Sequence, residues 1–319
     1  MSKEPIKTNR FWTSQNDNNK MLSIIIPFFN EKENLPILIN QLINQLNRLK
    51  KEYEIILVND GSTDDLISNL KSLMSNPNLK SVNHKKRLGK GRALKTGIEN
   101  SSGETIVFMD GDLQDDPEDL PKFLEKIDQG YEFINGIRIK RQDNLLVKLY
   151  SNLASYFLKT FLHSPYADIN CGFKAFKREV LSDFVFYGNS FRFFPLAVFY
   201  NGYKVTEINV RNNKRRFGQS KFGPGKLITG IFDTLTAYFL YKFSERPLHF
   251  FGTVGGVIFL IGFFISFYLT IERLFFGVLL VTRPLLWLGL LLIIVGIQIV
   301  MTGIIGELIV FLDKKSNHK

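Results

Sequence analysis

Two long apolar segments near the C-terminus limit what this chain can fold into. Residues 250–271 and 285–312 are almost continuously apolar, and each is close to or above the roughly 20 residues that a helix needs to cross a bilayer. Gln298 and Glu307 are the only strongly polar residues that interrupt them. Two buried helices of a soluble core are the alternative, but such helices normally carry a polar stripe. The sequence therefore predicts two transmembrane helices within residues 246–313.

The distribution of basic residues predicts how these helices are oriented. The link between them carries only Arg273 and Arg283 against Glu272, whereas both flanks are basic. Because basic flanks stay on the cytoplasmic side, we expect a multi-pass protein of the cytoplasmic (inner) membrane. The large N-terminal domain, both termini and a short tail at 314–319 would lie in the cytoplasm. The basic flanking residues are Arg211, Lys214, Arg215, Arg216, Lys221, Lys226 and Lys242 before the helices and Lys314, Lys315 and Lys319 after them.

Composition narrows the classes of partner. The formal net charge is +11 and the pI is about 9.5, yet no helix-turn-helix, zinc-finger spacing or RNP-like motif supports nucleic-acid binding. Basic residues that gather before a membrane span favour anionic headgroups or a lipid phosphate. Cys171 is the only cysteine, so no intrachain disulfide is possible, in agreement with a reducing compartment. Residues 1–20 are polar, do not resemble a signal peptide, and are predicted to be disordered.

Residues 21–225 alternate between strand and helix patterns. This alternation implies an α/β domain with a mainly parallel sheet, whose ligands collect at the carboxyl ends of the strands. Residues 226–245 are predicted to form a juxtamembrane interfacial helix. The predicted strands are Ser23–Pro27, Glu54–Val58, Lys80–Asn83, Thr105–Met109 and Tyr131–Ile134, and the predicted helices of the domain are 34–50, 64–74 and 90–100.

An acidic motif follows the fourth predicted strand. Gly111 lets the chain turn sharply, and alternate side chains of an extended segment point the same way, so Asp110 and Asp112 can face one cation. Two carboxylates and the amide of Gln114 suit Mg²⁺ or Mn²⁺. A solvated acidic turn is the alternative. Two other predicted strand ends, at Pro27 and Asp60, also carry turn or polar residues, which favours one shared crevice.

The chain carries six short motifs in the order Ile26–Glu31, Val58–Asp64, Leu88–Gly91, Asp110–Asp115, Asp168–Phe176 and Arg216–Lys221. Taken in this order, they resemble the motifs of family 2 glycosyltransferases with the GT-A fold, a Rossmann-like domain. The last two motifs and the two spans resemble the polyprenyl-phosphate glycosyltransferases, the group of dolichol-phosphate mannose synthase and bactoprenol glucosyltransferases. This resemblance covers nearly everything after residue 20 and implies a GT-A domain over residues 21–225. Asn59 is a departure, because family members often have Asp there.

The resemblance implies a nucleotide-sugar donor at the first four motifs, with UDP favoured and GDP open. Helix capping remains the alternative for Glu31, a solvated helix end for Lys90, and an Asx turn for Asp60. The implied donor-binding residues are Pro27, Phe29, Glu31, Asp60, Lys90, Asp110 and Gly111, and the implied ligands of Mg²⁺ or Mn²⁺ are Asp110, Asp112 and Gln114.

The later motifs imply a site for a phosphate acceptor. Arg138 offers the paired donors that suit a phosphate, and Asp168 is expected to order this side of the site, with a purely structural hydrogen bond as its alternative. The loop at 216–221 can instead be an electrostatic anchor. The implied acceptor-phosphate residues are Arg138, Arg141, Ser151, Arg216 and Lys221, and the implied catalytic residues are Asp112, Arg138, Asp168, Arg216 and Lys221.

The implied activity is that of an inverting, metal-dependent glycosyltransferase. It would transfer a sugar to the phosphate of undecaprenyl or dolichyl phosphate for cell-envelope glycan or lipid modification. Ser190–Pro195 and the absence of a later Gln-x-x-Arg-Trp count against polymer synthesis, and a largely dianionic phosphate needs no base. Transfer to a glycolipid or polysaccharide hydroxyl and a non-catalytic nucleotide-sugar-binding membrane scaffold are the alternatives. The resemblance also implies a homo-oligomer, either tetramer or dimer.

Overall fold

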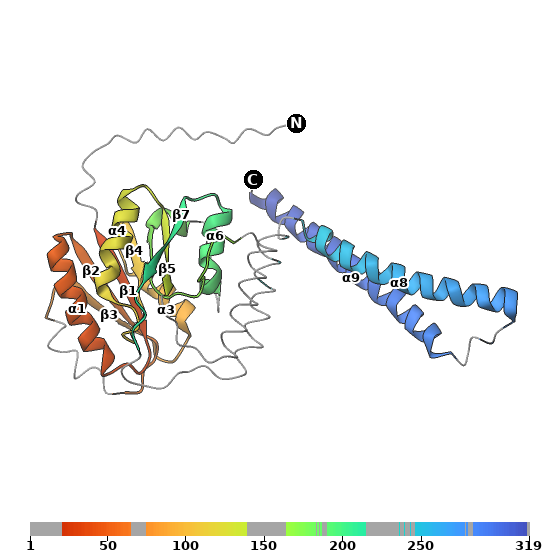
Figure 1. Ribbon diagram of the computed structural model, residues 1–319, viewed down its shortest axis with the longest axis horizontal. Helices are drawn as coiled ribbons and strands as arrows, with labels where there is room; N and C mark the ends of the chain where they lie inside the picture. The colour runs from red at the N-terminus through yellow and green to blue at the C-terminus, as the bar shows by residue number, and fades with distance from the viewer. Residues whose placement is uncertain are drawn as a thin grey trace. The chain divides into compact units, whose positions relative to one another are not determined.

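The computed structural model describes residues 21–64, 75–138, 164–182, 190–214, 246–277 and 283–317, with isolated positions between these ranges. The chain divides into two compact units, Met1–Asp233 and Thr234–Lys319. The first unit contains an α/β domain, and the second contains the two apolar helices (Figure 1).

A seven-stranded sheet with the order β3-β2-β1-β4-β6-β5-β7 forms the centre of the first unit. All neighbouring strands pair in parallel except β6, which is antiparallel to both β4 and β5. This arrangement confirms the predicted mainly parallel sheet. The strands are β1 (Leu22–Phe28), β2 (Tyr53–Asn59), β3 (Leu79–Asn83), β4 (Thr105–Phe108), β5 (Phe133–Arg138), β6 (Lys174–Lys177) and β7 (Val205–Val210).

Helices cover both faces of the sheet, which is why β1 is buried at every position. Alternate residues of β1 pack with α1 and α4 in one apolar cluster, and on the other face Gly97 of α3 lies against Ile25. A group of phenylalanines that includes Phe108, Phe176 and Phe194 fills the space beneath α6. The helices are α1 (Asn34–Leu49), α3 (Lys90–Glu99), α4 (Leu120–Asp128) and α6 (Phe194–Tyr200), and the short 3-10 turns are η2 (Pro117–Asp119), η3 (Arg178–Leu181) and η4 (Ser190–Phe193).

Four strands, β1, β2, β3 and β5, extend beyond the bounds that the sequence predicts. β1 continues through Pro27 to Phe28, which is possible because its pairing with β4 ends at Ile25. β5 begins two residues later and ends four residues later than the predicted Tyr131–Ile134, because Asn135 and Gly136 belong to the strand. This Asn-Gly pair reads as a turn by composition, yet Asn135 is fully buried. The predicted helix at 64–74 lies almost entirely outside the described residues.

The second unit is an antiparallel pair of long apolar helices, α8 (Pro247–Phe276) and α9 (Pro284–Asn317). Glycines bring their backbones together: a Cβ on Gly255 would lie 2.7 Å from the carbonyl oxygen of Gly296, and one on Gly262 would lie 2.7 Å from that of Gly289. Each helix is long and apolar enough to cross a membrane, and only 17% of the apolar window of each is buried. This exposure differs from that of the core helices of a soluble protein.

Two acidic residues within these helices have partners near the helix ends. Glu307 accepts a hydrogen bond from Leu248 N at the start of α8 (3.3 Å), where a carboxylate complements the helix dipole. Glu272 near the end of α8 forms an ion pair with Arg283 before α9. Both helices are therefore candidate membrane spans whose charged groups lie near their ends.

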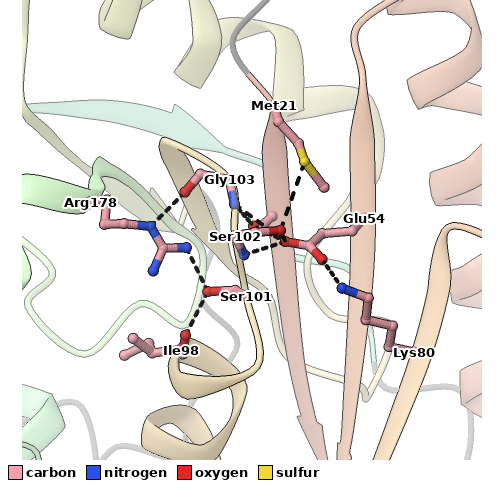
Figure 2. Close-up of polar contacts among 9 residues, drawn as sticks. Met21, Glu54, Lys80, Ile98, Ser101, Ser102, Gly103 and Arg178 are labelled. Atoms are coloured by element: carbon pink, nitrogen blue, oxygen red, sulfur yellow. Dashed lines mark hydrogen bonds and ion pairs between the residues drawn. The ribbon is translucent and has the colours of Figure 1, made fainter.

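A polar network stabilises the amino edge of the sheet, which is the edge where the parallel strands begin (Figure 2). Glu54 of β2 accepts hydrogen bonds from Ser23 Oγ (2.6 Å), Ser102 N (2.6 Å) and Lys80 Nζ (2.6 Å). Burial opposes ionisation of this carboxyl, but the donors outweigh it and lower its pKa to about 2. Arg178 extends the network by donating to the Gly103 carbonyl (2.8 Å).

Replacing this carboxylate should destabilise the domain in a pH-dependent way. Because the folded-state pKa of Glu54 lies below its ordinary value of 4.5, its contribution is present above pH 4.5 and is lost as the pH falls towards 2. We expect Glu54→Gln to lower the free energy of unfolding by about 2 to 3 kcal/mol at pH 7. Chemical denaturation of the full chain in detergent should show this difference narrowing at lower pH.

Glu99→Gln is the matched control, because Glu99 is an exposed partner of Lys95 at 3.9 Å, and such pairs contribute little. A loss in Glu54→Gln that equals the loss in the control, or that does not change with pH, would contradict the assigned role of the carboxylate.

Candidate active site

The carboxyl ends of six parallel strands, together with the segment that enters the antiparallel β6, meet at one edge of the sheet. Most of the site residues predicted from the sequence lie at this edge. They follow β1 and β2, form the start of α3, follow β4, or lie at the end of β5 and before β6. The topology therefore brings the predicted donor, metal and acceptor segments to the same side of the domain.

The loops after β1 and β2 are joined by hydrogen bonds. Asn30 has a left-handed backbone (φ 54°), its N–H donates to Ser62 Oγ (2.9 Å), and its side-chain oxygen accepts from Thr63 N (2.9 Å). Glu31 accepts from the side chain of Asn34, the first residue of α1 (2.7 Å). These contacts fix the path of the chain beside Phe29.

Asp60 organises the loop that leads into α3. Its carboxylate accepts from Leu88 N (2.8 Å) and Gly89 N (2.9 Å), and His84 Nδ1 lies 3.0 Å from its Oδ1. His84 also lies 3.0 Å from Thr96 Oγ1 through its other ring nitrogen. His84 was not predicted as a site residue; its place directly after β3, at the same edge of the sheet, is the sequence signal for it.

Gly61 allows this loop to approach the β2 end closely. A Cβ at Gly61, whose φ is 74°, would lie 2.5 Å from Arg87 N. The approach places the Arg87 guanidinium 4.3 Å from the centre of the Phe29 ring, a cation–π distance. Phe29 from the first motif and Arg87, the residue directly before the third motif, are thereby in contact.

The acidic motif after β4 has a constrained backbone. Leu113 is buried and left-handed (φ 60°), a conformation that costs free energy in a residue with a branched side chain. The turn lets Gln114 N donate to Asp112 Oδ1 (3.3 Å), and the Gln114 carbonyl accepts from Asn213 N (2.9 Å). Asp112 and Gln114 are each partly exposed.

Asp110 is held between a lysine and a glycine. Burial opposes ionisation of its carboxyl, but the ion pair with Lys90 Nζ and the nearby charges of Arg138 and Lys174 lower the pKa below its ordinary value. On the other side, a Cβ at Gly172 would lie 2.3 Å from Asp110 Oδ2. Only glycine leaves the carboxylate in this position.

Asp115 behaves differently from Asp110. It is buried and accepts from Asp110 N (3.2 Å). Burial and the neighbouring charges of Asp110 and Asp112 raise the pKa of Asp115 to about 7. Asp116 caps the η2 turn by accepting from Glu118 N (3.0 Å).

Arg138 and Asp168 form a two-pronged ion pair at the end of β5. Arg138 Nε donates to Asp168 Oδ2 (2.7 Å) and Nη2 donates to Oδ1 (2.9 Å). Burial opposes the charge of the guanidinium, but Asp168 raises the pKa of Arg138 above its ordinary value. Nearby, burial raises the pKa of the Cys171 thiol to about 12, which agrees with a packing role rather than a nucleophilic one.

The remaining predicted residues, Arg141, Ser151, Arg216 and Lys221, lie outside the described residues. Within the part of the chain that the structure describes, no group of three or more His, Cys, Asp or Glu side chains could hold a metal ion. A cation at the acidic motif would therefore need oxygen ligands in addition to Asp110 and Asp112.

Comparison with known proteins agrees with this arrangement. The family model described as Glycosyl transferase family 2 matches residues 23–185. The undecaprenyl-phosphate 4-deoxy-4-formamido-L-arabinose transferase of Pectobacterium atrosepticum is 32% identical over 92% of this chain and 89% of its own length. The dodecaprenyl-phosphate galacturonate synthase of Rhizobium johnstonii is 29% identical over 90% of this chain and 87% of its own length.

Solved structures show the same fold. Glucosyl-3-phosphoglycerate synthase from Mycobacterium tuberculosis, in complex with Mn²⁺, UDP-glucose and phosphoglyceric acid, superposes with a TM-score of 0.55 at 17% identity, covering 69% of this chain and 80% of that one. The predicted GT-A-like domain is thus confirmed at the level of the fold. The matched family model spans just over half of the chain, and the chain belongs to glycosyltransferase family 2.

Proposed function

We propose that this protein transfers a sugar from a nucleoside diphosphate sugar to the phosphate of a membrane polyprenyl phosphate. The observation that carries the proposal is the extent of the match to relatives named as polyprenyl-phosphate sugar transferases or synthases. It covers about nine-tenths of this chain, which is more than the first unit alone, and so extends into the region of the apolar helices. A lipid substrate is consistent with two candidate membrane spans.

The donor is proposed to lie along the loops after β1, β2 and β4. Phe29, with Arg87 over its ring, would provide a flat surface for the nucleotide base. Pro27 and Glu31 would shape the same loop, and Asp60 would act by ordering the Leu88–Gly89 turn rather than by its charge alone. Lys90 forms an ion pair with Asp110. Its ammonium therefore lies beside the acidic motif, where it would meet the diphosphate.

The acidic motif fits a divalent cation that is shared with the substrate. Asp110, Asp112 and Gln114 offer only oxygen atoms, which suit Mg²⁺ or Mn²⁺ and leave positions for phosphate oxygens. The complex of the mycobacterial synthase with Mn²⁺ and UDP-glucose supports the same choice by fold. When bound, such a cation would supply positive charge to the departing diphosphate.

The acceptor phosphate is proposed to bind beside Arg138. Nε and Nη2 of this guanidinium are oriented by Asp168, so Nη1 is the nitrogen that would meet a phosphate oxygen. The predicted partners Arg141, Ser151, Arg216 and Lys221 would complete this side. A positive-inside orientation would place the domain in the cytoplasm, where nucleotide sugars are available.

The proposed reaction is a single displacement with inversion. An oxygen of the polyprenyl phosphate attacks the anomeric carbon, a bond forms between them, and the bond to the donor's diphosphate oxygen breaks. Because a phosphate monoester loses its second proton near pH 6, it is largely dianionic at neutral pH and needs no protein base. The chain would contribute alignment and charge stabilisation.

Transfer to lipid phosphate is directly measurable. We expect the purified full chain, supplied with Mn²⁺ and undecaprenyl phosphate, to form a labelled lipid product from at least one member of a panel of UDP- and GDP-sugars. The product should release its sugar in mild acid, because a glycosyl phosphate is acid-labile and an ordinary glycoside is not. A protein that binds a donor but forms no product with any of the panel would refute the proposal.

Asp112→Ala should abolish metal-dependent turnover while leaving membrane insertion unchanged, because it removes a proposed metal ligand. We expect a loss of about 100-fold or more, measured at saturating Mn²⁺. Asp128→Ala is the matched control, since Asp128 is an exposed carboxylate whose partner Lys51 lies 3.6 Å away. Full activity in Asp112→Ala would show that the metal assignment is wrong.

Gly172→Ala should lower turnover with little effect on folding. Its methyl group would meet the end of a flexible side chain, Asp110 Oδ2 at 2.3 Å, so the carboxylate moves and the backbone does not. A displacement of a catalytic group by about 1 Å costs about 10- to 100-fold in rate. Gly202→Ala is the control: its left-handed backbone (φ 83°) makes it destabilising, with no atom within 4 Å of its new Cβ. Equal turnover losses in both variants would contradict the prediction.

A further inference from the structure

A row of polar side chains crosses three neighbouring strands at one level. Asn135 of β5 is in register with Lys174 of β6 on one side and with Glu207 of β7 on the other. Lys174 Nζ donates to Asn135 Oδ1 (2.8 Å), and Asn135 Nδ2 donates to Glu207 Oε1 (2.8 Å). The polar row, Lys174–Asn135–Glu207, is thus continuous from an ammonium to a carboxylate.

The polar row binds the backbone of the loop that precedes β6. Glu207 accepts from Ala167 N (2.7 Å) and Asp168 N (3.4 Å). Asn135 Nδ2 donates to the Asp168 carbonyl (2.9 Å). Lys174 Nζ donates to the carbonyls of Ile169 (3.3 Å) and Cys171. Successive main-chain groups between residues 167 and 171 are therefore held by side chains of the sheet.

Both ends of this loop touch the candidate active site. Asp168, near its beginning, orients the Arg138 guanidinium. Gly172, directly after its end, lies against the Asp110 carboxylate. A shift of the loop would therefore change the acceptor side and the acidic motif together.

The chemistry of the row favours orientation over bulk stability. Asn135 is fully buried and Lys174 is 4% exposed, and burial lowers the pKa of Lys174 to about 8. Removing charged and amide groups from water is costly, and an apolar set of similar volume would often be as stable. An apolar set could not bind the loop carbonyls and N–H groups, because it has no donors or acceptors.

We propose that Lys174, Asn135 and Glu207 are positioning residues that set the loop 167–172 for sugar transfer. The proposal rests on the proposed function for its kinetic consequence. Glu207 acts mainly on the Asp168–Arg138 pair, and Lys174 acts on the part of the loop that adjoins Gly172 and Asp110.

Glu207→Gln tests this assignment with an isosteric change. An amide cannot accept all the hydrogen bonds of the carboxylate, because in either orientation its NH₂ group faces a donor: Ala167 N–H on one side, or Asn135 Nδ2 and Asp168 N–H on the other. We expect the KM for undecaprenyl phosphate to rise about tenfold while the KM for the nucleotide sugar stays within about twofold.

Lys174→Met is the second variant. It should lower kcat and raise the KM for the nucleotide sugar, measured in the presence of Mn²⁺. Glu132→Gln is the control, because Glu132 accepts from Lys204 N (2.7 Å) just before the same pair of strands, at their amino ends.

Hydrogen exchange of the full chain in detergent separates this proposal from the proposed function. In Glu207→Gln and Lys174→Met, peptides covering 164–173 should exchange faster, while those of β1 and β2 keep the wild-type rate. If the wild type transfers no sugar but the loop loosens as expected, the proposed function fails and the positioning role stands. Unchanged exchange and unchanged KM values in both variants, or equal effects in Glu132→Gln, would overturn the positioning role.

Discussion

The site depends on balancing negative charge at one edge of a parallel sheet. Because parallel strands end together, their acidic end residues are forced into proximity. Asp110 and Asp115 show the two possible results of that crowding. Asp110 has the Lys90 ammonium beside it and its pKa falls despite burial, whereas burial and two nearby like charges raise the pKa of Asp115 to about 7. Basic side chains at this edge are therefore needed to keep several ionised carboxylates close together, even before any substrate binds.

Most of the anions at this edge act first on the protein itself. Asp60 holds the turn before α3, Asp168 orients Arg138, and Glu207 holds the loop that carries Asp168. Such contacts prepare a binding surface in advance, which reduces the cost of ordering it when a ligand arrives. They also mean that a phosphate meeting Arg138 or Lys90 joins an existing ion pair, so its binding energy depends on how the partner carboxylate is held.

Local patterns predicted the framework better than the contacts between its parts. Buried strands such as β1 and β4 are continuous apolar runs, and the acidic motif follows one of them directly, so both could be located from the sequence. Asn135 could not be, because its Asn-Gly pair suggests a turn and its partners Lys174 and Glu207 are 39 and 72 residues away in the chain. The same holds for Gly172, whose importance comes from its approach to Asp110. Tertiary contacts of this kind leave no local periodicity.

Carboxylates at the two edges of the sheet have opposite surroundings. At the amino edge, Glu54 accepts hydrogen bonds from four residues, and these donors lower its pKa to about 2 although burial opposes ionisation. At the carboxyl edge, Asp115 is buried, accepts a main-chain hydrogen bond from Asp110 and faces like charges. The left-handed backbones of Asn30 and Leu113 lie at this second edge as well. Strained turns and crowded carboxylates persist only where the surrounding structure holds them. The satisfied network at the amino edge and the covered strands between the two edges provide that support, which lets the carboxyl edge keep groups poised for ligands.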